Sequence, residues 1–116
     1  MSLAVASTSS RKWVHGHLDR IALLDSFSHL ACGDEVEQVK PAPDLYWLAL
    51  QRLGKDPSQA IAIEDSPNGI AAAKAAGLFC IAVPNPLTAR LDMSAADMRL
   101  ASLAELPLAE ALRAVT

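Results

Sequence analysis

The most informative segment of the sequence is Ala60-Ile61-Ala62-Ile63-Glu64-Asp65-Ser66-Pro67-Asn68-Gly69-Ile70, which continues through an alanine-rich segment to Gly77. Its first four residues are an apolar run that ends abruptly in two acids, a pattern typical of a strand buried on both faces. Ser66 then suits a helix N-cap, Pro67 the first helical position and Gly77 the C-terminal cap. The spacing predicts a strand over 60–63, a helix from 67, and a turn that carries Glu64 and Asp65.

The position of these two acids predicts a binding site. In open α/β sheets, ligands bind outside the carboxyl ends of the strands, which is where Glu64 and Asp65 are expected. Two adjacent carboxylates offer the hard oxygen ligands that Mg²⁺ prefers. The alternative explanation is a solvated loop with an acidic helix start, which the helix dipole favours.

The rest of the chain alternates short apolar runs with helical patterns. Strands are predicted at 3–6, 27–32, 79–83 and 99–102, and helices at 11–23, 45–53 and 104–114. Ser9 or Ser10 can cap the first of these helices, and Gly54 can end the second. Alternation of strands and helices is the signature of βαβ units with a parallel sheet. The sequence therefore predicts an α/β domain with flanking helices.

Composition excludes several classes of partner. The 116 residues are 52% hydrophobic, as expected for one globular domain, and carry a net charge of -3. This charge does not favour binding to nucleic acid or to an anionic membrane surface, and no apolar run approaches the roughly 20 residues of a membrane helix. The N-terminus lacks the layout of a signal peptide, so we expect a cytoplasmic protein. Cys32 and Cys80 are predicted to be reduced core residues.

Three motifs in order suggest a family. A hydroxyl, Ser7, stands at the end of the first predicted strand. Lys40-Pro41-Ala42-Pro43-Asp44 forms a loop that enters a helix, where Tyr46 and Trp47 are predicted to be packing residues. The acids of Glu64-Asp65-Ser-x-x-Gly follow about two dozen residues later. Together these pieces resemble the second, third and fourth motifs of the haloacid dehalogenase superfamily, in its phosphatase and β-phosphoglucomutase-like branch.

The resemblance implies a fold and a chemistry. The fold would be a Rossmann-like parallel sheet with flanking helices. Ser7, with Thr8 beside it, would bind a phosphoryl oxygen, and Lys40 would neutralise the charge that builds on that group during transfer. Asp65 would bind Mg²⁺, with Glu64 as a further ligand or as a holder of water. The complete protein would hydrolyse phosphate esters of small metabolites through an aspartyl-phosphate, or carry out a phosphoglucomutase-like transfer.

One motif of that family is missing here. The family's chemistry begins with an Asp-x-Asp pair that supplies the nucleophile and the acid/base, and no Asp-x-Asp occurs in these 116 residues. We interpret residues 1–116 as a partial core domain, the C-terminal part of a larger hydrolase, lacking the first strand and the cap. Without an activated carboxylate no aspartyl-phosphate forms, so we expect the chain alone to be inactive and to bind Mg²⁺ weakly or not at all.

The sequence allows more than one strand pairing and more than one function. In the family's sheet the first strand lies between the 3–6 strand and the 60–63 strand. Here these two must pair directly, borrow a strand from another molecule, or leave apolar edges exposed, which would lead to self-association. The alternative to an enzyme is a non-catalytic fragment or interaction module that retains the fold, because a fold does not by itself determine a function.

Overall fold

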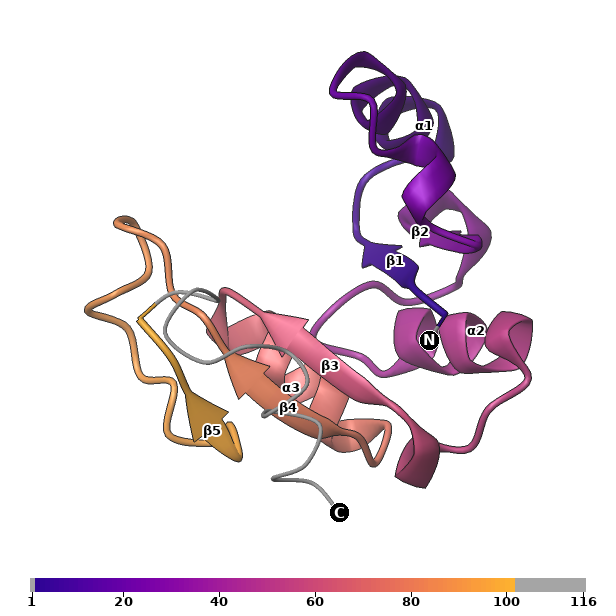
Figure 1. Cartoon of the computed structure of the whole chain (residues 1–116). Helices are drawn as coiled ribbons and strands as arrows, with labels where there is room; N and C mark the ends of the chain where they lie inside the picture. The colour runs from indigo at the N-terminus through magenta and orange to yellow at the C-terminus, as the bar shows by residue number, and fades with distance from the viewer. Residues whose placement is uncertain (1, 102–116) are drawn as a thin grey trace.

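A computed structural model describes residues 2–101, in which short strands alternate with helices along the chain (Figure 1). Within this range the elements are β1 (Ala4–Ser7), α1 (Arg11–Arg20), β2 (His29–Cys32), α2 (Asp44–Leu53), β3 (Ile61–Glu64), α3 (Pro67–Ala75), β4 (Phe79–Ala82) and β5 (Met98–Arg99). Single turns of 3-10 helix lie at Leu24–Ser26, Gly33–Glu35 and Pro57–Gln59. The helix predicted over 104–114 lies outside the described residues.

The strands form two parallel sheets. β1 pairs with β2, with Ala4 opposite His29 and Ser7 opposite Cys32. The second sheet has the order β3-β4-β5 and is also parallel throughout. Parallel sheets with flanking helices confirm the predicted α/β class. Within residues 2–101, β1 and β3 belong to different sheets, so they do not pair directly with each other.

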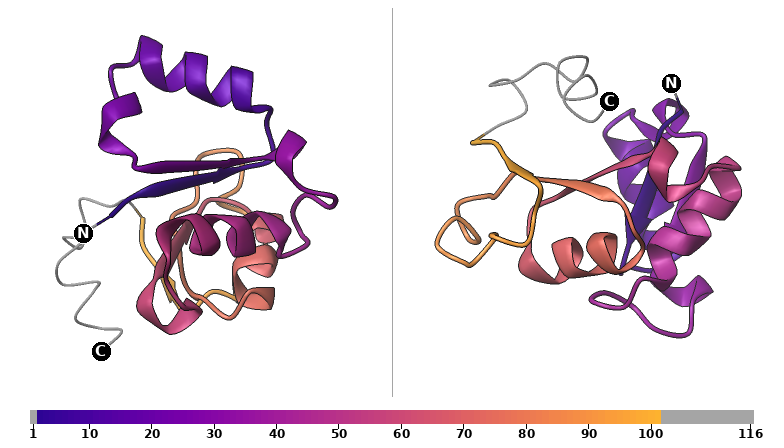
Figure 2. Two further views of the ribbon diagram at one scale, coloured as in Figure 1. Left: turned by 90° about the vertical axis from the view of Figure 1, so that its right-hand side faces the viewer. Right: turned by 90° about the horizontal axis from the view of Figure 1, so that it is seen from below.

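Helix α2 connects the two sheets. It lies on the opposite face of the β1–β2 sheet from α1, as the left view of Figure 2 shows. One side of α2 presents Leu45 and Ala49 to Ala31 of β2. Its other side joins the main core, which contains side chains of α2, β3, α3 and β4: Tyr46, Leu50, Ala62, Ile70, Ala72, Ala73 and Cys80. The sheets are therefore held together by shared packing on α2.

The predicted helix caps are confirmed, because they depend on residues close in sequence. The Ser10 hydroxyl accepts a hydrogen bond from the Trp13 N–H at 3.2 Å. The Ser66 hydroxyl accepts one from the Gly69 N–H, also at 3.2 Å. Gly54, with φ of 66°, adopts the left-handed conformation that ends helices and that lacks a steric penalty only for glycine.

Three local predictions need correction. The first helix ends at Arg20 rather than residue 23, and a turn with a positive φ of 59° at Ala22 follows it. Glu64 is the last residue of β3 rather than part of the turn. β3 is not buried on both faces: Ile63 is 41% exposed, because α2 and α3 cover only the face that bears Ala62 and Glu64.

Two other expectations concern the core and membranes. Both cysteines are free and buried, as predicted for reduced core residues. No helix among residues 2–101 is long and apolar enough to cross a bilayer.

Candidate active site

Lys40 brings together the carboxyl ends of the two sheets. It lies in the loop before α2, and its peptide bond to Pro41 is cis. The ammonium donates to the carbonyl oxygen of Ala6 in β1 at 2.9 Å and to Glu64 Oε1 at the end of β3 at 2.5 Å. Its side chain is only 14% exposed. The Lys40 ammonium therefore contacts Ala6 and Glu64, which lie 34 and 24 positions away from it in the sequence.

Glu64 is the buried acid of the site. It is 7% exposed, and its Oε1 accepts hydrogen bonds from both Lys40 and the hydroxyl of Tyr46. Its Oε2 lies against the first turn of α3, where a Cβ built on Gly69 would come within 1.8 Å of it. Burial, followed by the neighbouring charge of Glu64, raises the pKa of Tyr46, so the phenol stays protonated and can donate.

The hydroxyl-rich turn after β1 is braced by the turn after β2. Ser7 Oγ accepts from the Ser9 N–H at 3.1 Å, and the Ser9 carbonyl accepts from the Gly33 N–H at 2.8 Å. Gly33 is required at this approach, since a Cβ there would lie 1.9 Å from the Thr8 carbonyl oxygen. Ser7 directly follows Ala6, the residue bound by Lys40, whereas the Thr8 side chain is exposed. Lys40 thus binds the backbone of β1 at the residue directly before Ser7.

Asp65 faces outward, unlike Glu64. It is exposed, and its Oδ2 accepts a hydrogen bond from Asn85 Nδ2 at 3.1 Å. Asn85 belongs to the loop after β4, and its side-chain oxygen accepts from the backbone of Leu87 and Thr88. These bonds fix which side of the Asn85 amide faces Asp65. The two acids of the motif therefore point into different environments, as successive residues at a strand end do.

The donor chemistry of the site suits Mg²⁺, but the number of donors does not complete a shell. Carboxylate oxygens are the ligands this ion prefers, and about six oxygens in octahedral geometry surround it. Glu64 Oε1 already has two partners. Among residues 2–101, no group of three or more His, Cys, Asp or Glu side chains is arranged to hold a metal. Of the two acids only Asp65 is exposed, so it would hold the ion here, and water or other groups would supply the remaining ligands.

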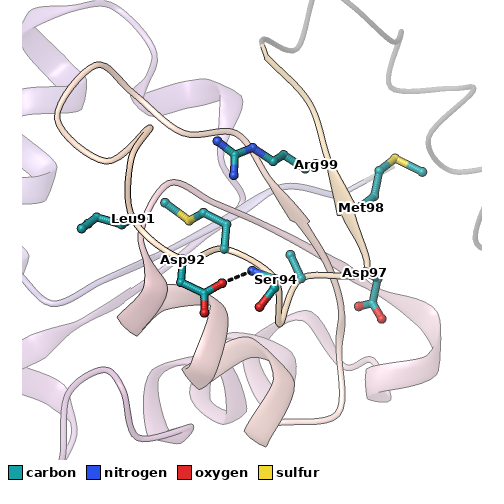
Figure 3. A pocket seen from close by; sticks show the side chains of 8 residues that line it. Leu91, Asp92, Ser94, Asp97, Met98 and Arg99 are labelled. Carbon is teal, nitrogen blue, oxygen red and sulfur yellow. Dashed lines mark hydrogen bonds between the residues drawn. The ribbon is translucent and has the colours of Figure 1, made fainter.

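Two hollows elsewhere contain none of the residues predicted for the site. A small cavity is lined by residues 91–94 and 96–99, where the Asp92 carboxylate accepts from the Ser94 N–H at 2.9 Å (Figure 3). A broader depression lies beside Glu35, where Arg11 and Arg52 are both paired with that carboxylate. Both arginines share the single Glu35 carboxylate and also donate to the carbonyl oxygen of Leu30. The Lys40 cluster is the better candidate because it lies at the carboxyl ends of β1 and β3, where ligands bind in parallel sheets.

Sequence reasoning missed two members of the site. Tyr46 was expected to be a packing residue, and it does pack in the core, but its hydroxyl also binds Glu64. Asn85 gave no signal beyond its place in a Pro-Asn-Pro loop. Trp47, also expected to pack, is 54% exposed, because it lies on the outer side of α2.

Comparisons with known proteins identify the family of this chain. Residues 1–83 match the family described as haloacid dehalogenase-like hydrolase. The protein YhcW of Bacillus subtilis (strain 168) is 48% identical over 109 residues, which are 94% of this chain and 50% of YhcW. Hexitol phosphatase B of Escherichia coli (strain K12) is 39% identical over 106 residues, which are 90% of this chain and 47% of that protein.

The fold also matches solved structures. The crystal structure of CbbY from Rhodobacter sphaeroides in complex with phosphate superposes with a TM-score of 0.87 at 42% identity, over 92% of this chain and 49% of that one. A variant of the same protein in complex with xylulose-(1,5)-bisphosphate gives a TM-score of 0.85. The chain spans about half the length of these relatives. With the family match over residues 1–83, these findings show that the chain belongs to the haloacid dehalogenase-like hydrolases.

Proposed function

We propose that this chain carries the phosphate-binding part of an enzyme that hydrolyses phosphate esters of small metabolites. The observation that supports this function is the position of the Lys40 ammonium, which lies between the end of β1, beside Ser7, and the end of β3, at Glu64. A fixed cation at the carboxyl ends of parallel strands is suited to bind a phosphoryl group. The CbbY structures, which hold phosphate and a sugar bisphosphate, support the same class of ligand.

Donor counting shows what the site can offer to a phosphoryl group. An ammonium has three N–H donors, of which Ala6 and Glu64 use two, so among the described residues one remains for a phosphoryl oxygen. Ser7 Oγ accepts from Ser9, and within residues 2–101 its own O–H has no acceptor and can donate to a ligand. The exposed hydroxyl of Thr8 is next in the chain. Lys40 and Ser7 are therefore the proposed phosphate-binding and catalytic residues, with Thr8 as a supplementary donor.

Mg²⁺ is the proposed cofactor of the complete enzyme. Its charge would stabilise the negative charge on the transferring phosphoryl group. Asp65, which is exposed at the end of β3, is the proposed ligand, with Glu64 adjacent. Glu64 also orients the site, since its Oε1 accepts hydrogen bonds from Lys40 and Tyr46.

The nucleophile of the reaction lies outside these 116 residues in this proposal, because the sequence contains no Asp-x-Asp. In the complete protein an aspartate oxygen would attack phosphorus while the P–O ester bond breaks. The leaving oxygen would take a proton from the second aspartate, and water would then hydrolyse the aspartyl-phosphate. The chain alone would bind the phosphoryl group without turnover.

A second candidate is a non-catalytic interaction module that retains the fold. It is favoured by the lack of an Asp-x-Asp and by the unpaired edge that β3, with Ile63 41% exposed, presents within the described residues. Such an edge would lead to self-association. Sedimentation velocity at several protein concentrations tests this, because a monomer at all concentrations contradicts it.

The test of the main proposal combines binding and turnover on the same material. We expect the 116-residue chain to bind inorganic phosphate in calorimetric titrations, and Lys40→Ala to abolish this binding. Lys55→Ala is the matched control, since Lys55 is exposed in the turn after α2. Hydrolysis of p-nitrophenyl phosphate in Mg²⁺ should be absent for the chain alone. Unchanged phosphate affinity in Lys40→Ala would contradict the proposed site, and Mg²⁺-dependent turnover by the wild-type chain would contradict the proposed source of the nucleophile.

A further inference from the structure

We propose that Tyr46 is a positioning residue of this site. Its hydroxyl holds the Glu64 carboxylate, and its ring holds the Lys40 ammonium. This inference rests on the proposed function, because there Lys40 is the group that binds the phosphoryl oxygen. Tyr46 itself need not contact the ligand. It would act on phosphate affinity through Glu64 and Lys40.

The first observation is the hydrogen bond from the Tyr46 hydroxyl to Glu64 Oε1. Both residues are buried, with 8% and 7% exposure. A buried carboxylate needs donors, since removing it from water without replacement hydrogen bonds is costly. Tyr46 and Lys40 supply two donors to the same oxygen, so the position of that oxygen is set by both.

The second observation is the contact between the same tyrosine and the cation. The Lys40 ammonium lies 5.1 Å from the centroid of the Tyr46 ring, within the range of a cation–π interaction. Tyr46 therefore touches both members of the ion pair. A lysine side chain has four rotatable bonds, and each contact that restrains its ammonium lowers the entropy lost when it binds a ligand.

The third observation is that Tyr46 packs in the core. It belongs to the core cluster that also contains Leu50, one helical turn further along α2, and Ala62 and Ile70 from β3 and α3. Gly69 leaves the space in which Glu64 Oε2 lies. Tyr46 thus transmits the fixed position of α2 to the two charged groups. Without the Tyr46 hydroxyl, Glu64 Oε1 would keep only the hydrogen bond from Lys40 among the described residues, and the ammonium would be less restrained.

The experiment compares Tyr46→Phe with the wild-type chain. This change keeps the ring and removes only the hydroxyl. We expect inorganic phosphate to bind on the order of fivefold more weakly, the factor that corresponds to one lost hydrogen bond. We also expect the Lys40 ammonium protons, followed by ¹⁵N NMR and assigned by their loss in Lys40→Arg, to exchange faster with water.

Two comparisons separate positioning from general destabilisation. Trp47→Phe alters an exposed ring on the same helix and should leave both readouts unchanged. Combining Tyr46→Phe with Glu64→Gln should weaken phosphate binding no further than Glu64→Gln alone, because both changes break one chain of contacts. A Tyr46→Phe protein that melts earlier, yet keeps wild-type phosphate affinity and ammonium exchange, would overturn the inference.

The remaining outcomes are also decisive. If the wild-type chain does not bind phosphate, the proposed function fails, whereas ammonium exchange still tests whether Tyr46 positions Lys40. If Tyr46→Phe does not fold, the exchange rate of the Tyr46 hydroxyl proton in the wild-type chain tests the inference instead. This proton can be assigned because Tyr46 is the only tyrosine in the sequence. A slowly exchanging hydroxyl proton close to the Glu64 side chain supports the inference, and a freely exchanging one overturns it.

Discussion

The ammonium of Lys40 and the carboxylate of Glu64 lie 2.5 Å apart, although 24 residues separate them in the chain. Their side chains are 14% and 6% exposed, so this is an ion pair largely removed from water. The desolvation of two charges offsets most of the attraction in such pairs. We infer that the pair contributes mainly to the geometry of the site, by placing one cation at the ends of β1 and β3.

Loss of Lys40 should destabilise the fold as well as the site. Lys40→Met leaves the Glu64 carboxylate buried with Tyr46 as its one remaining hydrogen-bonding side chain among residues 2–101, and breaking one side of a buried pair costs about 3–5 kcal/mol. Urea denaturation monitored by tryptophan fluorescence measures the effect. The double variant Lys40→Met/Glu64→Met should cost less than Lys40→Met alone. Additive losses would show that the two groups do not interact.

Gly69→Ala should be destabilising although alanine is the better helix former. The added Cβ would come within 1.8 Å of Glu64 Oε2, and this carboxylate cannot move freely because Lys40 and Tyr46 hold it. Overpacking of this kind costs about 1–3 kcal/mol. Gly16→Ala in α1 is the matched control, since its new Cβ would meet no described atom within 4 Å other than its chain neighbours and the backbone of its own helix. That change should stabilise by about 0.5–1 kcal/mol, and equal effects from both changes would contradict the crowding at Glu64.

Stability should decline in acid through Glu35. Hydrogen bonds from Arg52, the largest cause, lower the pKa of this carboxyl from its ordinary 4.5 to about 2. A lowered folded-state pKa means that the stabilisation is complete above about pH 4.5 and is lost as the pH falls toward 2. Urea midpoints at pH 6 and pH 3 measure it. The decline should be smaller in Glu35→Gln, and an equal decline in both proteins would assign the acid sensitivity to other carboxyls.

The two thiols should be unreactive in the folded protein. Cys32 and Cys80 are both fully buried. Burial, the largest cause, raises the pKa of Cys80 to about 11 and also raises that of Cys32, so neither forms the reactive thiolate at pH 8. Ellman's reagent should therefore label neither thiol in buffer and both in concentrated urea. Rapid labelling in buffer would show that the core opens locally at one of these strands.

Local signals in the sequence predicted the elements well. Ser10 and Ser66 cap helices as expected, and Gly54 ends α2, because caps depend on residues within one turn of each other. The helix that ends at Arg20 was predicted too long, since the apolar spacing continues to Leu23 whereas the backbone turns at Ala22.

The sequence was sufficient to predict a strand, a turn and a helix over the β3–α3 region, the order of Ser7, Lys40 and the acidic pair, and the family that these motifs indicate. Each of these predictions rests on spacing along the chain. That Glu64 turns inward to Lys40 and Tyr46 while Asp65 turns outward to Asn85 became visible in the tertiary structure alone. These contacts join residues 18 to 24 positions apart. The Glu64 contacts form because α2 packs against both sheets, and the Asp65 contact forms because β3 pairs with β4. No pattern within one segment encodes such packing, so the partners of each acid could not be predicted from the sequence.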